Sequence, residues 1–202
     1  MKNILLVLCI FFIPFPGLCQ DEMDNRIKMI TEYGSDIRTI QDMFTFEQID
    51  YYQVKFVGAG LKGKNFYLVM KDLWDGEIIK TDTLVNTSTN ERMLPISSDT
   101  LNLRVTAKKI TDSELKLIFR FPQFGISKTY KATESNDYSL RDVGRSLKIE
   151  TGKEFSAFAY ILPYEKDGWK MWCAVDSSGK DIEKWGKEFG LKHYLIFEMK
   201  FD

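Results

Sequence analysis

The stretch LNLRVTAKKITDSELKLIFRF, residues 101–121, decides the fold class. Its apolar residues recur at every second position on both sides of Thr111-Asp112-Ser113, which has the composition of a turn. A period of two is typical of a strand with one buried face. Pro122 ends the second run because proline has no backbone N–H to donate to a sheet. The alternating apolar residues are Leu101, Leu103 and Val105 before the turn and Leu115, Leu117, Phe119 and Phe121 after it.

Similar short runs of β-forming residues occupy most of the chain on either side of this stretch. Asp75-Gly76 and Asp167-Gly168 separate two pairs of runs, and Asp-Gly is a strong hairpin signal. The loop of the second hairpin is either these two residues or the four residues 165–168. Aromatic residues make up 14% of the chain, which also favours strands. The further predicted strands cover residues 49–57, 65–73, 78–85, 126–132, 155–163, 169–175 and 192–201.

Two helices complete the predicted elements. The first covers about residues 22–43, where Met23, Ile27, Ile30, Ile37, Ile40 and Met43 recur at spacings of three, four and seven. A membrane-surface role for this helix is disfavoured because its polar face holds more carboxylates, at Asp24, Glu32, Asp36 and Asp42, than cations, at Arg26, Lys28 and Arg38. The second helix covers residues 181–189 and precedes the last strand. We therefore predict a mainly β protein, a β-sandwich or an open antiparallel barrel of about nine or ten strands.

The predicted hairpin of residues 155–175 has two faces of different character. Phe158, Tyr160, Leu162, Tyr164, Trp169, Met171 and Cys173 fall on one face, which we expect to be core. The other face carries Ala157, Ala159, Ile161, Lys170 and Trp172. Because that face is small and partly apolar, we expect another element, such as a helix, to cover part of it. Trp172 is the tryptophan that we expect at the surface.

The first nineteen residues have the pattern of a secretory signal peptide. Lys2 precedes an apolar run from Ile4 to Ile13, and Pro14 and Pro16 then break any helix. A run of that length is too short to span a bilayer, which takes about 20 residues, and no later run is longer. We therefore expect export to the periplasm or outer surface of a Gram-negative bacterium. Residues 20–202 are expected to form a single β-rich domain.

Two interpretations of Cys19 stay open. In the first, a signal peptidase cuts after Cys19, because Gly17 and Cys19 are the small residues that its recognition site requires. In the second, Cys19 becomes the lipidated residue of an envelope lipoprotein. The acidic residues 20–24 resemble the export tags of some Gram-negative surface lipoproteins, whereas Leu18 is larger than the residue that usually precedes a lipidated cysteine.

Composition excludes several classes of site and partner. Cys9 and Cys19 lie in the signal segment, so Cys173 is the single remaining cysteine and no internal disulfide forms. One cysteine and one histidine are too few for a zinc site, and no cofactor is expected. After removal of Lys2 the charged residues number 27 basic and 29 acidic, a net charge of −2. These charges are interspersed along the chain without a basic stripe, so we do not expect nucleic-acid binding.

His193 is the only histidine, and it falls in phase with the apolar face of the last predicted strand. This position favours a buried histidine whose ring nitrogens are satisfied by hydrogen bonds over a catalytic base. A thiol–imidazole pair with Cys173 is the catalytic alternative, and it requires the two strands to be neighbours.

The candidate ligand-binding residues are aromatic. Trp172, Trp74 at a predicted hairpin turn, and Tyr164 are the side chains that we expect to contact a ligand, because exposed aromatic rings bind sugars and protein partners. Two Asp-Thr-Leu segments resemble the O-glycosylation acceptor of some Gram-negative envelope proteins, with Thr83 and Thr100 as the modified residues.

These features favour a non-enzymatic binding module of the cell envelope that recognises a protein or a glycan. Two alternatives stay open. A hydrolase could cleave glycans with two of the many carboxylates, although no pair can be selected from sequence because the required separation is spatial. An envelope inhibitor or immunity protein would act through surface complementarity and needs no motif.

Overall fold

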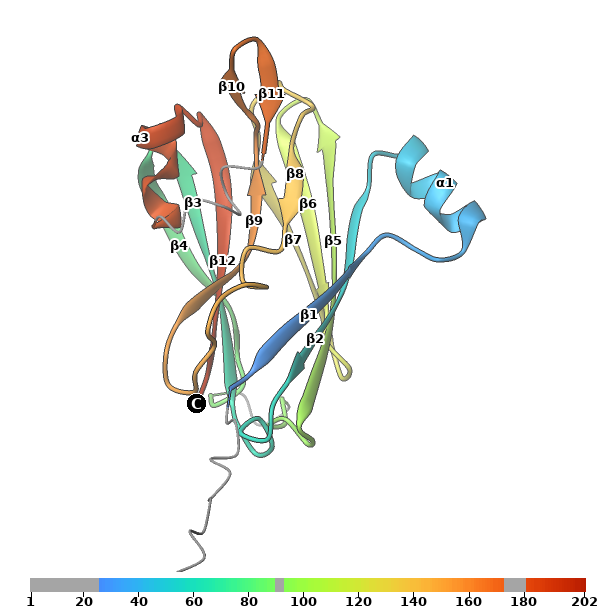
Figure 1. The fold of residues 1–202 in the computed structure, drawn as a ribbon, viewed down its shortest axis with the longest axis vertical. Coiled ribbons are helices and arrows are strands. Elements are labelled where there is room, and N and C mark those ends of the chain that lie inside the picture. Colours follow the sequence, from blue (N-terminus) through green and yellow to red (C-terminus); the bar gives the residue numbers. More distant parts are fainter. Residues whose placement is uncertain (1–25, 90–92, 173–180) are drawn as a thin grey trace, which may run out of the picture.

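The protein is a β-sandwich of two antiparallel sheets, each with five strands, and a separate two-stranded hairpin (Figure 1). The computed structural model describes residues 26–89, 93–172 and 181–202. Both sheets are open, which confirms the mainly β prediction and selects the sandwich over a barrel. Among the described residues, no helix combines the length and the apolar character needed to cross a membrane.

The first sheet has the strand order β1-β2-β5-β6-β7. Residues 101–121 form its two central neighbours, β5 and β6, on either side of the predicted turn. The bounds are Lys28–Tyr33 for β1, Asp50–Val57 for β2, Thr100–Thr111 for β5, Glu114–Arg120 for β6 and Gly125–Lys131 for β7.

The second sheet has the order β4-β3-β12-β9-β8, so the last strand of the chain lies at its centre. Its bounds are Phe66–Trp74 for β3, Glu77–Asn86 for β4, Ser139–Arg141 for β8, Phe155–Ile161 for β9 and His193–Phe201 for β12. The separate hairpin consists of β10 (Tyr164–Lys166) and β11 (Trp169–Met171), and the helical elements are α1 (Arg38–Phe46), η1 (Ile182–Lys184) and α3 (Trp185–Phe189).

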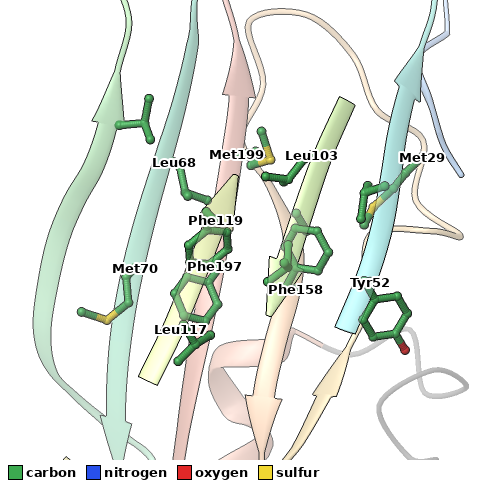
Figure 2. Close-up of a cluster of buried hydrophobic side chains, with 14 of the residues drawn as sticks. Met29, Tyr52, Leu68, Met70, Leu103, Leu117, Phe119, Phe158, Phe197 and Met199 are labelled. Carbon is green, nitrogen blue, oxygen red and sulfur yellow. The ribbon is translucent and has the colours of Figure 1, made fainter. Parts of the chain in front are cut away.

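Aromatic side chains from both sheets interlock in the core (Figure 2). The ring centroids of Phe119 on β6 and Phe197 on β12 lie 5.0 Å apart, and those of Phe56 on β2 and Phe201 on β12 lie 5.3 Å apart. All four rings are fully buried. The alternating apolar residues seen in the sequence therefore form the interface between the sheets, where hydrophobic burial supplies most of the stabilisation.

Both Asp-Gly turns have the predicted conformation. Asp75 and Gly76 have φ values of 49° and 78°, and Asp167 and Gly168 have 52° and 79°. Positive φ at both central residues is the signature of a two-residue hairpin turn whose twist matches the flanking strands. The second hairpin therefore has the shorter of its two predicted loops.

The predicted helix over residues 22–43 is wrong for most of its length. Residues 28–33 form β1, which pairs with β2, and α1 begins only at Arg38. Ile27 and Met29 are buried at a spacing of two, so the chain follows a strand period that the helical pattern obscured. Gly34, at φ 78°, turns the chain between the strand and the helix.

The hairpin predicted for residues 155–175 is confirmed only beside its turn, where Tyr164–Lys166 pairs with Trp169–Met171. Strand β9 pairs with β12 and β8, whereas β10 and β11 pair only with each other and project beyond the sandwich (Figure 1). Pro163 lies between β9 and β10, and it cannot donate to a sheet ladder. Trp169, predicted to be core, is therefore 75% exposed. Cys173 lies outside the described residues.

The predicted cover on the small face of β9 is confirmed. Ala159 and Ile161 pack in a second apolar cluster with Ile182 and Trp185 from the two short helical elements. Gly186 and Gly76 approach so closely that a Cβ on either would clash, which presses the start of α3 against the β3–β4 turn. The outer face of this sheet is thus partly closed by a helix.

Replacing Phe197 tests the packing between the two sheets. A Phe197→Ala substitution should lower the free energy of unfolding by about 3–5 kcal/mol, because it leaves a cavity between Phe119 and the second sheet. Urea unfolding followed by circular dichroism measures this change. Phe46→Ala is the matched control: Phe46 is 85% exposed, so its loss should change stability by less than about 0.5 kcal/mol. Equal losses for the two variants would contradict the described core.

Candidate functional site

The three predicted ligand-binding aromatics are each half-buried and held by internal contacts. The Trp74 ring stacks on His193 with centroids 4.2 Å apart, and the Tyr164 ring lies 5.2 Å from Phe189. The Trp172 indole N–H donates to the Asp137 carbonyl oxygen at 3.3 Å. The structure does not join the three rings into one open platform. The expectation that Trp172 is the surface tryptophan is wrong, because Trp169 holds that position.

His193 is fully buried and both of its ring nitrogens have partners, which confirms the structural interpretation. With its hydrogen on Nε2, the ring donates to Asp72 Oδ1 at 3.0 Å and accepts the Tyr138 hydroxyl on Nδ1 at 2.6 Å. Burial raises the pKa of Tyr138, so this hydroxyl keeps its proton. The Tyr138 oxygen also accepts the Thr133 backbone N–H at 3.0 Å. Asp72, His193 and Tyr138 thus form a chain of hydrogen bonds, and both ring nitrogens of His193 are used within it.

A second buried carboxylate, Asp50, links the two sheets. Asp50 on β2 accepts the Tyr33 hydroxyl at 3.0 Å and the Leu140 backbone N–H of β8 at 3.1 Å. Burial raises the pKa of Asp50, while these hydrogen bonds and nearby Arg141 oppose the shift. Burial and the neighbouring Asp50 charge raise the pKa of Tyr33 to about 12, so Tyr33 remains a donor. This cluster holds β1, β2 and β8 together.

The outer face of the first sheet is strongly basic. The strand registers place alternate residues of all five strands on this face, opposite the core. The carboxylates among them are Glu32 and Glu114. The cations among them are Lys28, Lys55, Arg104, Lys108, Lys116, Arg120 and Lys131, and we call this surface the basic face.

Cations of the basic face lie directly opposite one another on neighbouring strands. Arg104 pairs in register with Arg120, and Lys108 with Lys116. Like charges directly opposite each other destabilise a sheet. Carboxylates lie near Lys55 (Glu32, 4.0 Å) and Lys108 (Glu47, 2.5 Å). Within the described ranges, the two arginines have no carboxylate within ion-pair distance.

A half-buried cation of the second sheet, Lys71, is neutralised by carboxylates. The Lys71 ammonium lies 2.5 Å from a Glu183 carboxylate oxygen and 2.8 Å from one of Glu198. Burial would lower the pKa of Lys71, but the hydrogen bonds to these two carboxylates outweigh it and raise the pKa. Two carboxylates therefore neutralise Lys71, whereas no carboxylate of the described residues neutralises Arg104 or Arg120.

A groove of about 290 Å³ crosses the basic face beside the arginine pair. The polar residues that line it are Gln53, Lys55, Asn102, Arg104 and Arg120. None of the described residues that line it is acidic. Guanidinium groups bind carboxylates, sulfates and phosphates through two parallel N–H donors. The groove therefore has the donors to bind an oxyanion.

A second groove, of about 360 Å³, lies on the outer face of the second sheet and holds two carboxylates, Glu154 and Glu198. The hydrolase alternative requires two carboxylates that face each other at a defined separation across a cleft. Glu198 is however the ion-pair partner of Lys71, and Lys200 also lines the groove. The mixed charges here indicate internal pairing, whereas the groove of the basic face has a single sign.

The predicted modification sites lie on different sheets, and Thr100 falls on the outer face of the first sheet with Asn102 and Arg104. Thr83 is exposed on β4, and Thr100 is half-buried at the start of β5. Cys19 lies outside the described residues. In the part of the chain that the structure describes, no group of three His, Cys, Asp or Glu residues is placed to hold a metal ion.

Sequence reasoning missed the basic face although its signal is present in residues 101–121. The polar positions of those two strands include Arg104, Lys108, Lys116 and Arg120, which alternate with the apolar core residues. Along the chain, basic and acidic residues are interspersed without a basic stripe. When the charged residues are assigned to the two faces of each strand and β5 is placed beside β6, the cations fall together on one face. We expected no nucleic-acid binding because the sequence showed no basic stripe, and that reason is wrong. The expectation that the protein does not bind nucleic acid stays a prediction.

The pH dependence of stability should reveal Asp50. Because its pKa is raised on folding, Asp50 favours the folded state most at low pH, and this contribution is lost as the pH rises through the folded pKa. The free energy of unfolding of the wild type minus that of Asp50→Asn should therefore fall between about pH 3 and pH 7. Urea titrations across this range measure the difference.

The exposed Asp42→Asn variant on α1 supplies the control for removal of a carboxylate. A difference between wild type and Asp50→Asn that rises with pH would contradict the assigned direction.

The basic face and its groove are the arrangement best suited to binding a partner. A scan of protein-family models, a search of curated proteins and a search of solved structures each found no match to the chain.

Proposed function

We propose that the protein is an exported, non-enzymatic binding module that recognises an anionic partner through its basic face. The observation that supports this most directly is the Arg104–Arg120 pair, directly opposed across β5 and β6. No carboxylate of the described residues pairs with either arginine, and two guanidinium groups side by side lower the stability of the sheet. A bound oxyanion would offset that repulsion, so the pair is explained by a ligand and not by the fold.

The lining of the groove indicates the chemistry of the recognised group. The forks of Arg104 and Arg120 match the two oxygens of a carboxylate, sulfate or phosphate. The amides of Gln53 and Asn102 add neutral donors and acceptors that suit hydroxyl or ester oxygens beside the anion. A face with a net positive charge also raises the local concentration of anions and speeds their association.

A single Arg104→Glu substitution separates binding from folding. It places a carboxylate opposite Arg120, which turns a repulsive cross-strand pair into an attractive one. The free energy of unfolding should rise by about 0.2–1 kcal/mol. Binding to dextran sulfate, a soluble polyanion, should weaken at least about tenfold because a charge-assisted contact is replaced by repulsion. Urea unfolding and isothermal titration calorimetry measure the two effects.

Lys62→Glu is the matched control, because this substitution changes the net charge by the same amount as Arg104→Glu. Lys62 is exposed in the turn between β2 and β3. It should leave dextran sulfate binding within about twofold of wild type, because exposed charges away from the site are screened by salt. Uncharged dextran should not bind. If both variants lose the same affinity for dextran sulfate, the loss follows from net charge alone and a binding site at Arg104 is refuted.

A further inference from the structure

Helix α1 has an apolar side that no described part of the chain covers. Ile37, at the start of the helix, is 61% exposed, Met43 is 62% exposed and Phe46 is 85% exposed. No residue of the helix is buried. Large apolar side chains gathered on one exposed element mark a surface that meets another molecule or a membrane.

The helix stands on the same side of the molecule as the basic face. It leaves the sheet between β1 and β2 and projects beside β5 (Figure 1). Phe44 faces inward, with its ring 5.2 Å from that of Tyr51, an outer-face residue of β2. Glu47, at the end of the helix, lies 2.5 Å from the Lys108 ammonium of the basic face. The exposed apolar side chains thus adjoin the cations.

We infer that the anionic partner is a phospholipid surface, into which α1 inserts its apolar side while the basic face contacts the headgroups. This inference rests on the proposed function, whose site it extends. An interfacial helix lies in the membrane plane with its apolar side at the boundary between headgroups and acyl chains. Nearby lysines and arginines add attraction to anionic lipids. Helix α1 spans only Arg38–Phe46, far fewer than the roughly 20 residues needed to cross a bilayer.

The spread of the charges favours a membrane over a soluble polyanion. Every strand of the first sheet contributes at least one cation to the basic face, so the cations extend across the whole sheet. A plane of anionic headgroups can meet all of them together. A soluble acidic glycan offers no apolar phase to cover Met43 and Phe46, whereas a bilayer provides both phases.

The structure also removes the objection that sequence raised against a membrane-surface helix. The polar side of the helical segment holds too few cations of its own, since Arg38 is accompanied by Asp36 and Asp42. The missing cations come from the sheet on which the helix stands: Lys108 pairs with Glu47 at the end of the helix, and Lys116, Arg104 and Arg120 lie beyond it. The apolar and the cationic parts of the surface belong to different elements.

Vesicle binding tests the inference. The exported protein is isolated from cells that express a precursor with Cys19→Ala, so that no acyl chain can be attached and mask the effect. Co-sedimentation is measured with vesicles of equimolar phosphatidylcholine and phosphatidylglycerol, and with vesicles of phosphatidylcholine alone. The wild-type surface should bind the anionic vesicles at least about tenfold more tightly than the neutral ones. Weak or equal binding to both would overturn the inference.

Two double variants divide the surface into its parts. M43S/F46S should weaken binding to anionic vesicles at least about tenfold while leaving dextran sulfate binding unchanged, because only the membrane offers an apolar phase. R104E/R120E should weaken both. I79S/L94S is the matched control, since Ile79 and Leu94 are 59% and 60% exposed and lie outside α1; it should leave vesicle binding as in the wild type. Circular dichroism confirms that each variant is folded.

The outcomes separate the two proposals. If M43S/F46S binds anionic vesicles as tightly as wild type, the inference that α1 inserts into the membrane is wrong, and the proposal that the basic face binds anions stands. If R104E/R120E binds both anionic vesicles and dextran sulfate as tightly as wild type, the basic face is not the site and the proposed function is wrong. Tight binding to dextran sulfate without binding to anionic vesicles would assign the basic face to a soluble polyanion and overturn the inference.

Discussion

The register between β5 and β6 is the constraint on which both the core and the basic face depend. The same ladder that places Val105 opposite Phe119 inside the sandwich places Arg104 opposite Arg120 outside it. A shift of one residue would move every side chain to the other face. Burial of a side chain such as Phe119 stabilises by about 1.5–3 kcal/mol, more than the roughly 0.2–1 kcal/mol of a cross-strand charge pair. The hydrophobic core therefore holds the arginines together against their repulsion.

Sequence periodicity predicted the sandwich well because most strands have one buried face and one solvent face. It failed at residues 28–33, where Ile27 and Met29 follow a strand period while Ile27 and Ile30 follow a helix period. It also failed at the chain after Pro163, where Trp169 and Met171 alternate like core residues although they belong to a hairpin with no sheet beneath it. In both places the structure depends on which strand the segment pairs with, and the local sequence pattern does not identify that strand.

The candidate site shows the same limit. The burial of His193 was predicted from its position in an apolar strand. Its partners Asp72 and Tyr138 lie 121 and 55 residues away along the chain, so no spacing could identify them. Export and lipidation of the N-terminal segment stay predictions. The cations of the basic face could have been found from sequence, given the pairing of β5 with β6 and the rule that alternate residues share a face.

The attachment of α1 has a consequence for how this surface can change. Tyr33 and Tyr52, the paired residues beside the point where the helix leaves the sheet, lie opposite each other with ring centroids 5.0 Å apart, and the Gly34 N–H donates to the Tyr51 carbonyl at 2.8 Å. The two ends of the excursion are therefore as close as the ends of a hairpin turn. Because the entropy of closing a loop depends only weakly on its length, the sandwich tolerates a shorter, longer or chemically different insert at this point. The helix is an exchangeable module, and descendants of this fold can acquire a new contact surface without altering the register of a single strand.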